Sequence, residues 1–480
     1  MNVQLLIDNA DCDAAGRRRF ERRNPVTGEV ATSAAAASVA DANMAVEAAA
    51  RAFPAWSAVA PTARRMLLLK AADAMQARSD AFAALMTAET GATAPWAHFN
   101  VMLAANMLRE AAAMTTQVSG EVIPSDKPGT LALAVRKPAG VCVGIAPWNA
   151  PVILATRAIA MPLACGNTVV LKTSEMCPGT QSLIGEVFRE AGFAAGVVNV
   201  ISNQPQDAAA VVEALIAHPA TRRINFTGST RVGRIIAETA GRHLKPVLLE
   251  LGGKAPLIVL EDADLDQAVD AAIFGAFANQ GQICMSTERI IVVESVADAF
   301  VAKFAARAKK LPSGDPRGHV VLGSLVTVEA AEKVEALVAD ARSKGAVVAA
   351  GGGRNGSIME ATVVDRVTET MRIYREESFG PAKSVIRVKD ADEAVRVAND
   401  TEYGLSAAVF SRDINRALDI AGRIETGICH INGPTVHDEA QMPFGGVKGS
   451  GYGRFGGKAA IAEFTDLRWI TIEGPQHYPF

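Results

Sequence analysis

The feature that most constrains the fold is an alternation of short β-rich runs with helical segments between residues 141 and 218. The β-rich runs cover residues 141–145, 168–172 and 197–201. The helical segments that separate and follow them lie near residues 150–164, 179–191 and 206–218. Strands that alternate with helices in this way are typical of a parallel, doubly wound sheet.

A second round of the same alternation follows residue 250. Here the expected strands cover residues 255–260 and 289–293, and the expected helices cover residues 265–278 and 296–310. The Ala-rich stretch of residues 35–113 has helical spacing throughout. A chain of 480 residues has room for more than one domain of ~150 residues, so we expect two α/β lobes.

Two segments fit neither lobe. Residues 120–137, around Pro128 and Gly129, and residues 464–473 both alternate apolar and polar side chains like exposed strands. Long strands outside a domain core leave unpaired edges. We therefore expect these two segments to pair with each other across subunits and to form a homo-oligomer, either a homodimer or a dimer of dimers.

Charge and cysteine content narrow the class of partner. The net charge is −3 and the charged residues are interspersed, so no basic stripe indicates nucleic acid or an anionic lipid surface. A small molecule is the expected partner, with no nucleic acid and no membrane. The 6 cysteines form no CxxC pair and no Cys/His cluster, which argues against a metal site and a disulfide scaffold. No basic leader precedes an apolar run at the N-terminus, so we expect a reducing, cytoplasmic location.

Two motifs carry the chemistry: Glu250-Leu251-Gly252-Gly253-Lys254, and residues 279–284, which end in Cys284. Alone, Cys284 would most often be a buried core residue, and Glu250 a solvated acid at a strand end. Together they supply a general base and a sulfur nucleophile. A thiolate is strongly nucleophilic near neutral pH and leaves readily from an acyl group, so the pair predicts covalent chemistry through a thioester.

A dinucleotide site is indicated at the carboxyl edge of the first sheet. Gly228 and Gly233 lie between an apolar strand and a helix, where they allow backbone and helix N-terminus to approach a pyrophosphate. By itself this spacing also suits a turn without a ligand. Glu175 could bind the adenosine ribose hydroxyls and would repel a 2′-phosphate, whereas Lys172 could tolerate one. NAD is therefore the favoured cofactor, and NADP stays open.

Seven motifs in the same order support a family resemblance. They are Pro147-Trp148-Asn149 and residues 172–175, 226–233, 250–254, 280–284, 377–381 and 443–446. On these motifs the chain resembles the aldehyde dehydrogenase superfamily over nearly its whole length. It looks most like the bacterial branch that acts on salicylaldehyde, vanillin and benzaldehyde.

The resemblance implies a role for each catalytic residue. Cys284 would attack the aldehyde carbonyl, and the oxyanion of the thiohemiacetal would be held by the Asn149 amide and the backbone N–H of Cys284. After hydride transfer to the nicotinamide, Glu250 would activate the water that hydrolyses the thioester. The reaction would be an irreversible oxidation of the aldehyde to the acid.

It also implies a set of residues for the cofactor. Glu377 and Phe379 would meet the nicotinamide end, Trp148 and Ser229 the pyrophosphate, and Lys172 and Glu175 the adenosine ribose. The full cofactor set is Ile145, Trp148, Lys172, Ser174, Glu175, Gly228, Ser229, Gly233, Leu251, Glu377 and Phe379.

The residues beside the nucleophile suit an aromatic aldehyde. The expected pocket set is Trp96, Phe99, Arg157, Ile283, Met285, Thr435 and Phe444. Trp96 and Phe99 have the spacing of a helix face and could equally belong to the core. Arg157, in an apolar helix, must find a carboxylate or face a polar substrate group; an ion pair is slightly favoured over a ring hydroxyl. Ala150 stands where salicylaldehyde-preferring relatives would carry Gly, so vanillin is considered beside salicylaldehyde.

The predicted fold is therefore α/β, with two doubly wound parallel-sheet lobes plus a small β oligomerisation element. The lobes are a Rossmann-like dinucleotide-binding domain of residues 1–118 and 139–249 and a catalytic domain of residues 250–448. Residues 119–138 and 449–480 would form the oligomerisation strands and tail. Three alternatives remain: an aliphatic or semialdehyde dehydrogenase, a CoA-acylating relative, which Glu250 disfavours, and an inactive binding or structural protein, which the presence of all three catalytic residues disfavours.

Overall fold

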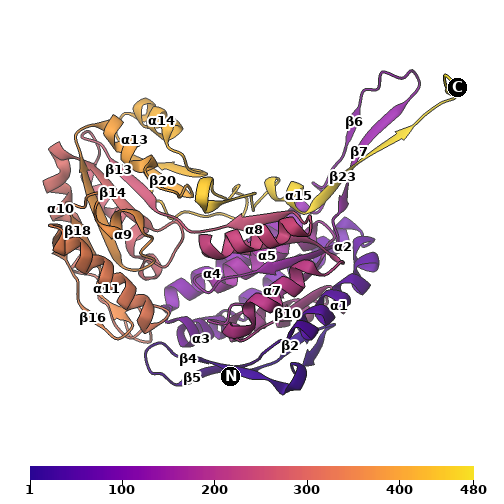
Figure 1. Cartoon of the computed structure of the whole chain (residues 1–480), viewed down its shortest axis with the longest axis horizontal. Coiled ribbons are helices and arrows are strands. Elements are labelled where there is room, and N and C mark those ends of the chain that lie inside the picture. Colours follow the sequence, from indigo (N-terminus) through magenta and orange to yellow (C-terminus); the bar gives the residue numbers. More distant parts are fainter.

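Eight strands form the central sheet of the larger lobe in the computed structural model, which describes every residue from Met1 to Phe480 (Figure 1). The strands are β2 (Leu5–Ile7), β3 (Ala10–Cys12), β8 (Val141–Ile145), β9 (Thr168–Lys172), β10 (Val198–Ile201), β11 (Thr221–Thr227), β12 (Val247–Glu250) and β22 (Gly451–Tyr452). Their order is β22-β12-β11-β8-β9-β10-β2-β3. The run from β12 to β10 is parallel, while β22 and the β2-β3 hairpin pair antiparallel at the two edges.

Helices cover both faces of this sheet. They are α1 (Val39–Ser57), α2 (Pro61–Ala77), α3 (Ser79–Thr90), α4 (Ala94–Met114), α5 (Pro151–Ala164), α6 (Pro178–Glu190), α7 (Ala208–Ala217) and α8 (Thr230–Arg242). Side chains alternate between the faces along each strand. In β8, Cys142 packs with the core of α2 to α6, whereas Val143 and Ile145 pack with the core of α1, α7 and α8. The predicted parallel, doubly wound sheet is therefore confirmed.

The smaller lobe contains a second sheet of the same kind. Its strands are β13 (Ala255–Val259), β14 (Thr287–Val293), β15 (Val347–Ala350), β18 (Thr362–Asp365), β19 (Ala382–Val388), β20 (Ser406–Phe410) and β21 (Ile428–Ile431). The order is β15-β18-β19-β14-β13-β20-β21, and only β15 is antiparallel.

One face of this second sheet is covered by α9 and α10, and the other by α11 to α14. The bounds of these helices are α9 (Leu265–Phe277), α10 (Glu294–Ala308), α11 (Val328–Ser343), α12 (Arg372–Arg375), α13 (Ala391–Asn399) and α14 (Ile414–Arg423).

A three-stranded arm projects from the larger lobe and carries the C-terminus (Figure 1). It consists of β6 (Glu121–Ile123), β7 (Leu131–Pro138) and β23 (Thr465–Ile472), with the short helix α15 (Ala459–Glu463) leading into it. The two segments expected to pair across subunits instead pair antiparallel within one chain, with Thr465 opposite Pro138 and Ile472 opposite Leu131. Pairing across subunits was therefore wrong, because the chain after α15 returns beside β7.

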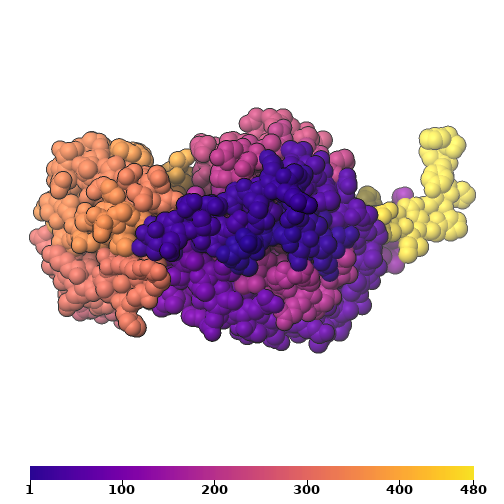
Figure 2. Space-filling model, turned by 90° about the horizontal axis from the view of Figure 1, so that it is seen from below, coloured from indigo at the N-terminus to yellow at the C-terminus, as the bar shows by residue number.

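Several short strands, most of them near the N-terminus, were not anticipated from the sequence. A sheet of order β1-β5-β4 is formed by β1 (Asn2–Val3), β4 (Arg19–Arg23) and β5 (Val30–Ala35), and a small hairpin by β16 (Arg354–Asn355) and β17 (Ile358–Met359). Figure 2 shows the N-terminal segment lying across the larger lobe towards the smaller one, with the C-terminal residues projecting at the opposite end. Arg22 contributes to this contact, since its guanidinium donates to the Val326 carbonyl at 2.7 Å.

None of the helices combines the length and apolar character needed to cross a lipid bilayer. The domain boundaries drawn from the sequence remain predictions.

Candidate active site

The ends of the central strands place three predicted site residues in one row. Glu250 lies opposite Thr227, and Ile145 lies opposite both Phe226 and Lys172. These positions are the carboxyl ends of parallel strands, where open α/β sheets bind their ligands.

A cavity of about 260 Å³ opens at this edge. It is lined by Pro147, Trp148, Asn149, Thr227, Gly228, Ser229, Leu251, Gly252, Cys284, Glu377 and Phe379. Six of the expected cofactor residues are in this lining, but Ile145, Lys172, Ser174, Glu175 and Gly233 are not. Gly233 instead lets α8 pack closely against Leu251, in the loop after β12, because a Cβ atom at Gly233 would lie 2.4 Å from Leu251 Cδ2. Pro147, Thr227 and Gly252 were missed from the sequence.

A second and larger cavity, of about 560 Å³, also reaches Cys284 and Asn149. Of its 25 lining residues, 17 are hydrophobic, so it suits an apolar ligand. The thiol of Cys284 therefore lies where a cavity at the sheet edge meets an apolar one. Such a junction lets one sulfur atom face two different ligands.

The loop that carries Cys284 is held in an unusual backbone conformation. In the 3₁₀ turn Ala278–Gly281, Asn279, Gln280 and Gly281 have φ values of 48°, 57° and 74°. Gly281 cannot be replaced easily, since a Cβ atom would lie 2.3 Å from the Gly380 carbonyl oxygen. At Gly253 a Cβ atom would lie 2.1 Å from the Cys284 carbonyl oxygen. The two motifs found in the sequence are thus in direct backbone contact.

Asn149 is fixed against the same loop. Its Nδ2 donates to the Gln282 carbonyl at 3.0 Å, and its own carbonyl accepts from Trp96 Nε1 at 3.2 Å and from Asn279 Nδ2 at 2.9 Å. An amide nitrogen carries two hydrogens, so one N–H of Asn149 remains for another acceptor. Asn149 therefore presents a donor within the cavity wall beside Cys284.

Glu250 is buried without a hydrogen-bond partner on either carboxyl oxygen. Burial raises its pKa to about 8, although Arg157 and Arg454 oppose the shift. Most buried polar groups are satisfied, and a functional site is a frequent reason for an exception. A carboxyl group with this pKa can take up and release a proton near neutral pH.

The Cys284 thiol has its pKa raised to about 12 by its apolar surroundings and by the nearby carboxyl groups of Glu250 and Glu377. Arg157 opposes this shift. The thiol is therefore protonated at neutral pH in this state, and its proton must be removed when the sulfur attacks an electrophile.

Glu377 closes the other side of the smaller cavity. Its Oε1 accepts the Gly253 N–H at 2.9 Å, and burial raises its pKa to about 7. The next aromatic residue, Phe379, has a positive φ of 48° and meets Trp148 edge-on with ring centroids 5.6 Å apart. These contacts fix one carboxyl oxygen of Glu377 and leave the other for a ligand.

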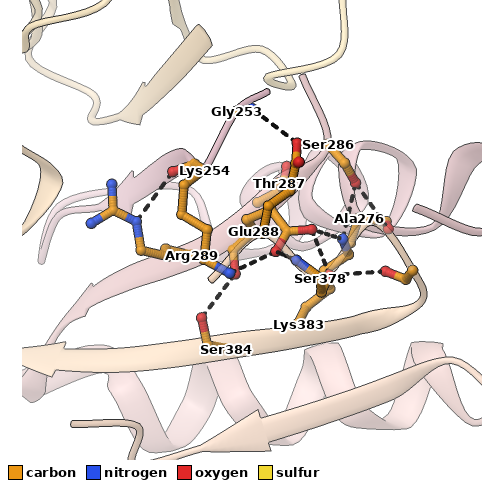
Figure 3. A network of polar contacts seen from close by, with 12 residues as sticks. Gly253, Lys254, Ala276, Ser286, Thr287, Glu288, Arg289, Ser378, Lys383 and Ser384 are labelled. Carbon is orange, nitrogen blue, oxygen red and sulfur yellow. Dashed lines mark hydrogen bonds and ion pairs between the residues drawn. The ribbon is translucent and has the colours of Figure 1, made fainter. Parts of the chain in front are cut away.

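A buried ionic cluster around Glu288 holds these loops together (Figure 3). Lys254 Nζ lies 2.7 Å from Glu288 Oε2 and Lys383 Nζ lies 2.9 Å from Oε1. Ser378 donates to Glu288 from both its N–H, at 3.0 Å, and its hydroxyl, at 2.6 Å. Burial opposes the charge of Glu288, but the two lysines outweigh it and lower its pKa to about 2. Lys254 follows Gly253 and Ser378 follows Glu377. The cluster therefore fixes both partners of the hydrogen bond between the Gly253 N–H and the Glu377 carboxylate.

The residues expected in the substrate pocket divide into two groups. Trp96, Phe99, Arg157, Ile283, Met285 and Phe444 line the larger cavity. Thr435 does not: it is fully buried behind the wall, where its hydroxyl donates to the Met285 carbonyl at 2.7 Å. The following residue, Val436, takes the lining position. The expectation for Thr435 was therefore wrong by one residue.

Arg157 forms the ion pair that the sequence favoured. Its guanidinium binds Asp438, and both side chains are largely buried. The guanidinium also lies 4.2 Å from the ring centroid of Phe444, a cation–π distance. Arg157 and Asp438 therefore place a buried ion pair in the lining of a mostly apolar cavity.

Comparisons with known proteins agree with this geometry. The aldehyde dehydrogenase family matches residues 12–470. Vanillin dehydrogenase from Pseudomonas fluorescens is 63% identical over 481 residues, which cover 100% of each chain. The NAD(+) benzaldehyde dehydrogenase from Pseudomonas putida is 40% identical over 461 residues, or 95% of this chain and 94% of its own. The crystal structure of a salicylaldehyde dehydrogenase from Pseudomonas putida G7, complexed with salicylaldehyde, superposes with a TM-score of 0.99 at 52% identity, covering 100% of both chains.

Proposed function

The chain belongs to the aldehyde dehydrogenase family, and from this premise we propose that it oxidises aromatic aldehydes to carboxylic acids with NAD. The vanillin, salicylaldehyde and benzaldehyde types are the expected substrates. The observation that carries the proposal is the position of Cys284 between an apolar cavity and a cavity at the carboxyl edge of the sheet.

The residues at the sheet edge fit a dinucleotide. Ser229 caps α8, accepting the Val232 N–H at 3.4 Å, and so places the first N–H groups of the helix beside the smaller cavity. The free carboxyl oxygen of Glu377 suits a ribose hydroxyl. Lys172 and Glu175, 3.4 Å apart at the end of β9, suit the second ribose, and Lys172 leaves NADP possible. When bound, NAD supplies the hydride acceptor.

Each catalytic side chain then has a defined task. The Cys284 thiol releases its proton to solvent as its sulfur attacks the aldehyde carbon, and the free N–H of Asn149 and the backbone N–H of Cys284 stabilise the oxyanion that forms. Loss of hydride leaves the acyl group on Cys284 as a thioester. Glu250 removes a proton from the water that attacks this thioester, and the acid and the free thiol are released.

The Asn149→Ala variant is expected to lower kcat by ~10² to 10³, the usual loss for one oxyanion donor. The change removes the side-chain N–H but leaves the backbone carbonyl that Trp96 and Asn279 bind. Steady-state kinetics with benzaldehyde would measure it, with thermal unfolding as the control for structure. A variant that folds and keeps the wild-type kcat would remove Asn149 from the oxyanion site.

The function itself is tested by NADH absorbance with vanillin, salicylaldehyde, benzaldehyde, succinic semialdehyde and hexanal. We expect an aromatic preference, an acid product without CoA, and no turnover in Cys284→Ala. Preference for the semialdehyde or hexanal would keep the mechanism and overturn the substrate class. No turnover of any aldehyde would favour an inactive binding protein.

A homo-oligomer is proposed from the arm. Four large apolar side chains of β6 and β23 are at least 60% exposed: Val122, Leu467, Trp469 and Ile472. Apolar strands exposed at an edge are a frequent interface between identical chains. We also propose a cytoplasmic location, as expected from the sequence.

Size-exclusion chromatography with light scattering is expected to give two or four times the chain mass of 50.2 kDa. Replacing Trp469 with Arg should shift the protein towards the monomer, since it puts a charge into the buried interface. A wild-type monomer, or an oligomer that Trp469→Arg leaves intact, would contradict the proposed interface.

A further inference from the structure

The cavity on the substrate side is larger than one aromatic ring requires. An apolar cavity of about 150 Å³ is enough to bind benzene. The cavity beside Cys284 measures about 560 Å³, more than three times that volume. Vanillin and salicylaldehyde carry a single ring, so a large part of the space remains beyond it.

The walls of the cavity extend the apolar surface away from the nucleophile. Asp270, Phe274 and Phe277 of α9 all line it, at i, i+4 and i+7 on one helix face. Seven residues of α-helix span about 10 Å at 1.5 Å per residue. Phe277 leads directly into the loop of Cys284, so Asp270 marks the far end. From α4, Trp96, Phe99 and Leu103 provide a wall with similar spacing.

The far end of the cavity presents apolar side chains to solvent. Phe274 is 53% exposed and Val321 is 48% exposed, and both line the same cavity. Asp270 and Arg307 form an ion pair at 2.7 Å at this end. Single exposed apolar residues are common, but here an aromatic and an aliphatic side chain line the same apolar cavity and extend its apolar wall to the solvent.

We propose that the site also oxidises two-ring aromatic aldehydes, in which a second ring is linked to the position para to the formyl group. The first ring would lie beside Trp96 and Phe99, with the formyl carbon at Cys284. The second ring would contact Phe274 and Val321 at the mouth. The proposal rests on the proposed aldehyde oxidation and assigns the outer residues of the cavity as specificity determinants.

The probe is 4-benzyloxybenzaldehyde, compared with benzaldehyde as the single-ring reference. Because a few apolar contacts change selectivity by 10-fold to 200-fold, we expect kcat/KM for the two-ring aldehyde to exceed that for benzaldehyde by at least about tenfold. Phe274→Ala and Val321→Asp should each reduce this ratio by about tenfold.

A matched control is available in Val347, which is 49% exposed on β15 and lines neither the cavity at Cys284 nor the one at the sheet edge. Val347→Asp should leave both substrates and their ratio unchanged. If wild type oxidises benzaldehyde but prefers it to the two-ring aldehyde, or if Phe274→Ala and Val321→Asp keep the wild-type ratio, the inference is wrong. If benzaldehyde is not oxidised at all, the proposed function fails first, so the two failures are distinguishable.

Discussion

The Cys284→Ser variant is expected to oxidise aldehydes at least about 10⁴-fold more slowly than wild type, since loss of a catalytic nucleophile can cost up to about 10⁶-fold in kcat. A serine hydroxyl is far less acidic than a thiol and is a poorer leaving group from an acyl intermediate, so both halves of the reaction suffer. The thiol at the junction of the two cavities has no neighbouring cysteine that could replace it. Steady-state NADH formation with benzaldehyde measures the loss.

Cys429 provides the matched control for this experiment. It is also a partly buried free thiol with a pKa raised, by burial, to about 11, but it lines neither cavity. Cys429→Ser should retain the wild-type rate. Loss of activity in Cys429→Ser together with retention in Cys284→Ser would place the nucleophile elsewhere.

The raised pKa of Cys284 adds a pH dependence to its reactivity. Without cofactor, the rate of alkylation by iodoacetamide should increase about tenfold per pH unit, up to the highest pH at which the protein stays soluble. The reason is that the thiolate fraction keeps increasing with pH until the pKa of about 12 is reached. Prior alkylation should abolish turnover.

The core of the fold could be predicted from the sequence because both sheets consist of apolar strands separated by helices. Residues such as Val143 and Val170 are buried on a sheet with helices on both faces, and that environment leaves a continuous apolar run. The N-terminal strands β1 and β4 could not be predicted. They are short and partly exposed, and β1 pairs with the distant residues Ser33 and Ala34, so local periodicity carries little signal for them.

The arm shows a different limit of prediction. Alternating side chains identified β7 and β23 as strands, but alternation does not say which chain supplies the partner. The return of the chain through α15 decides that β23 pairs with β7 of the same molecule.

The two parts of the site also differ in how far the sequence revealed them. Glu250 and Cys284 stand in motifs whose glycines are needed for close backbone contacts, and Asn149 ends the Pro147-Trp148-Asn149 motif, so a recognisable pattern surrounds each of them. Phe274, Arg307 and Val321 come from two helices and a loop without any motif. They become neighbours only when α9 and α10 pack on the second sheet, and ordinary helical residues of this kind look like surface in a sequence.

The Glu250→Gln variant is expected to release one equivalent of NADH per active site rapidly and then to turn over about 10² to 10⁴-fold more slowly than wild type. Glutamine keeps the shape of the side chain but cannot accept a proton from water, so the thioester on Cys284 accumulates. A rapid-mixing measurement of NADH shows the burst, and mass spectrometry of the quenched protein shows the acyl group. A loss of the burst itself would assign Glu250 to the first half of the reaction.

The pKa of Glu250 fixes how this step depends on pH. A general base acts in its ionised form, and with a pKa of about 8 only about a tenth of the enzyme has Glu250 ionised at pH 7. Where hydrolysis limits turnover, the wild-type rate should increase nearly tenfold per pH unit below pH 8 and level off above it. The Glu250→Gln variant should lack this pH-dependent increase.

The raised pKa of Glu250 also gives a control for folding. It makes stability fall as pH rises, which is opposite to the effect of a salt-bridged acid with a lowered pKa. In the unfolded chain Glu250 releases its proton near its usual value of 4.5, but in the folded protein only near 8, so folding becomes less favourable as pH rises through this window. Glutamine carries no charge to desolvate. At pH 8 to 9 the free energy of unfolding of Glu250→Gln should therefore equal or exceed that of wild type, which separates lost hydrolysis from lost structure. A variant that is both slow and clearly less stable would mean that Glu250 serves packing, and would leave the water-activating base unassigned.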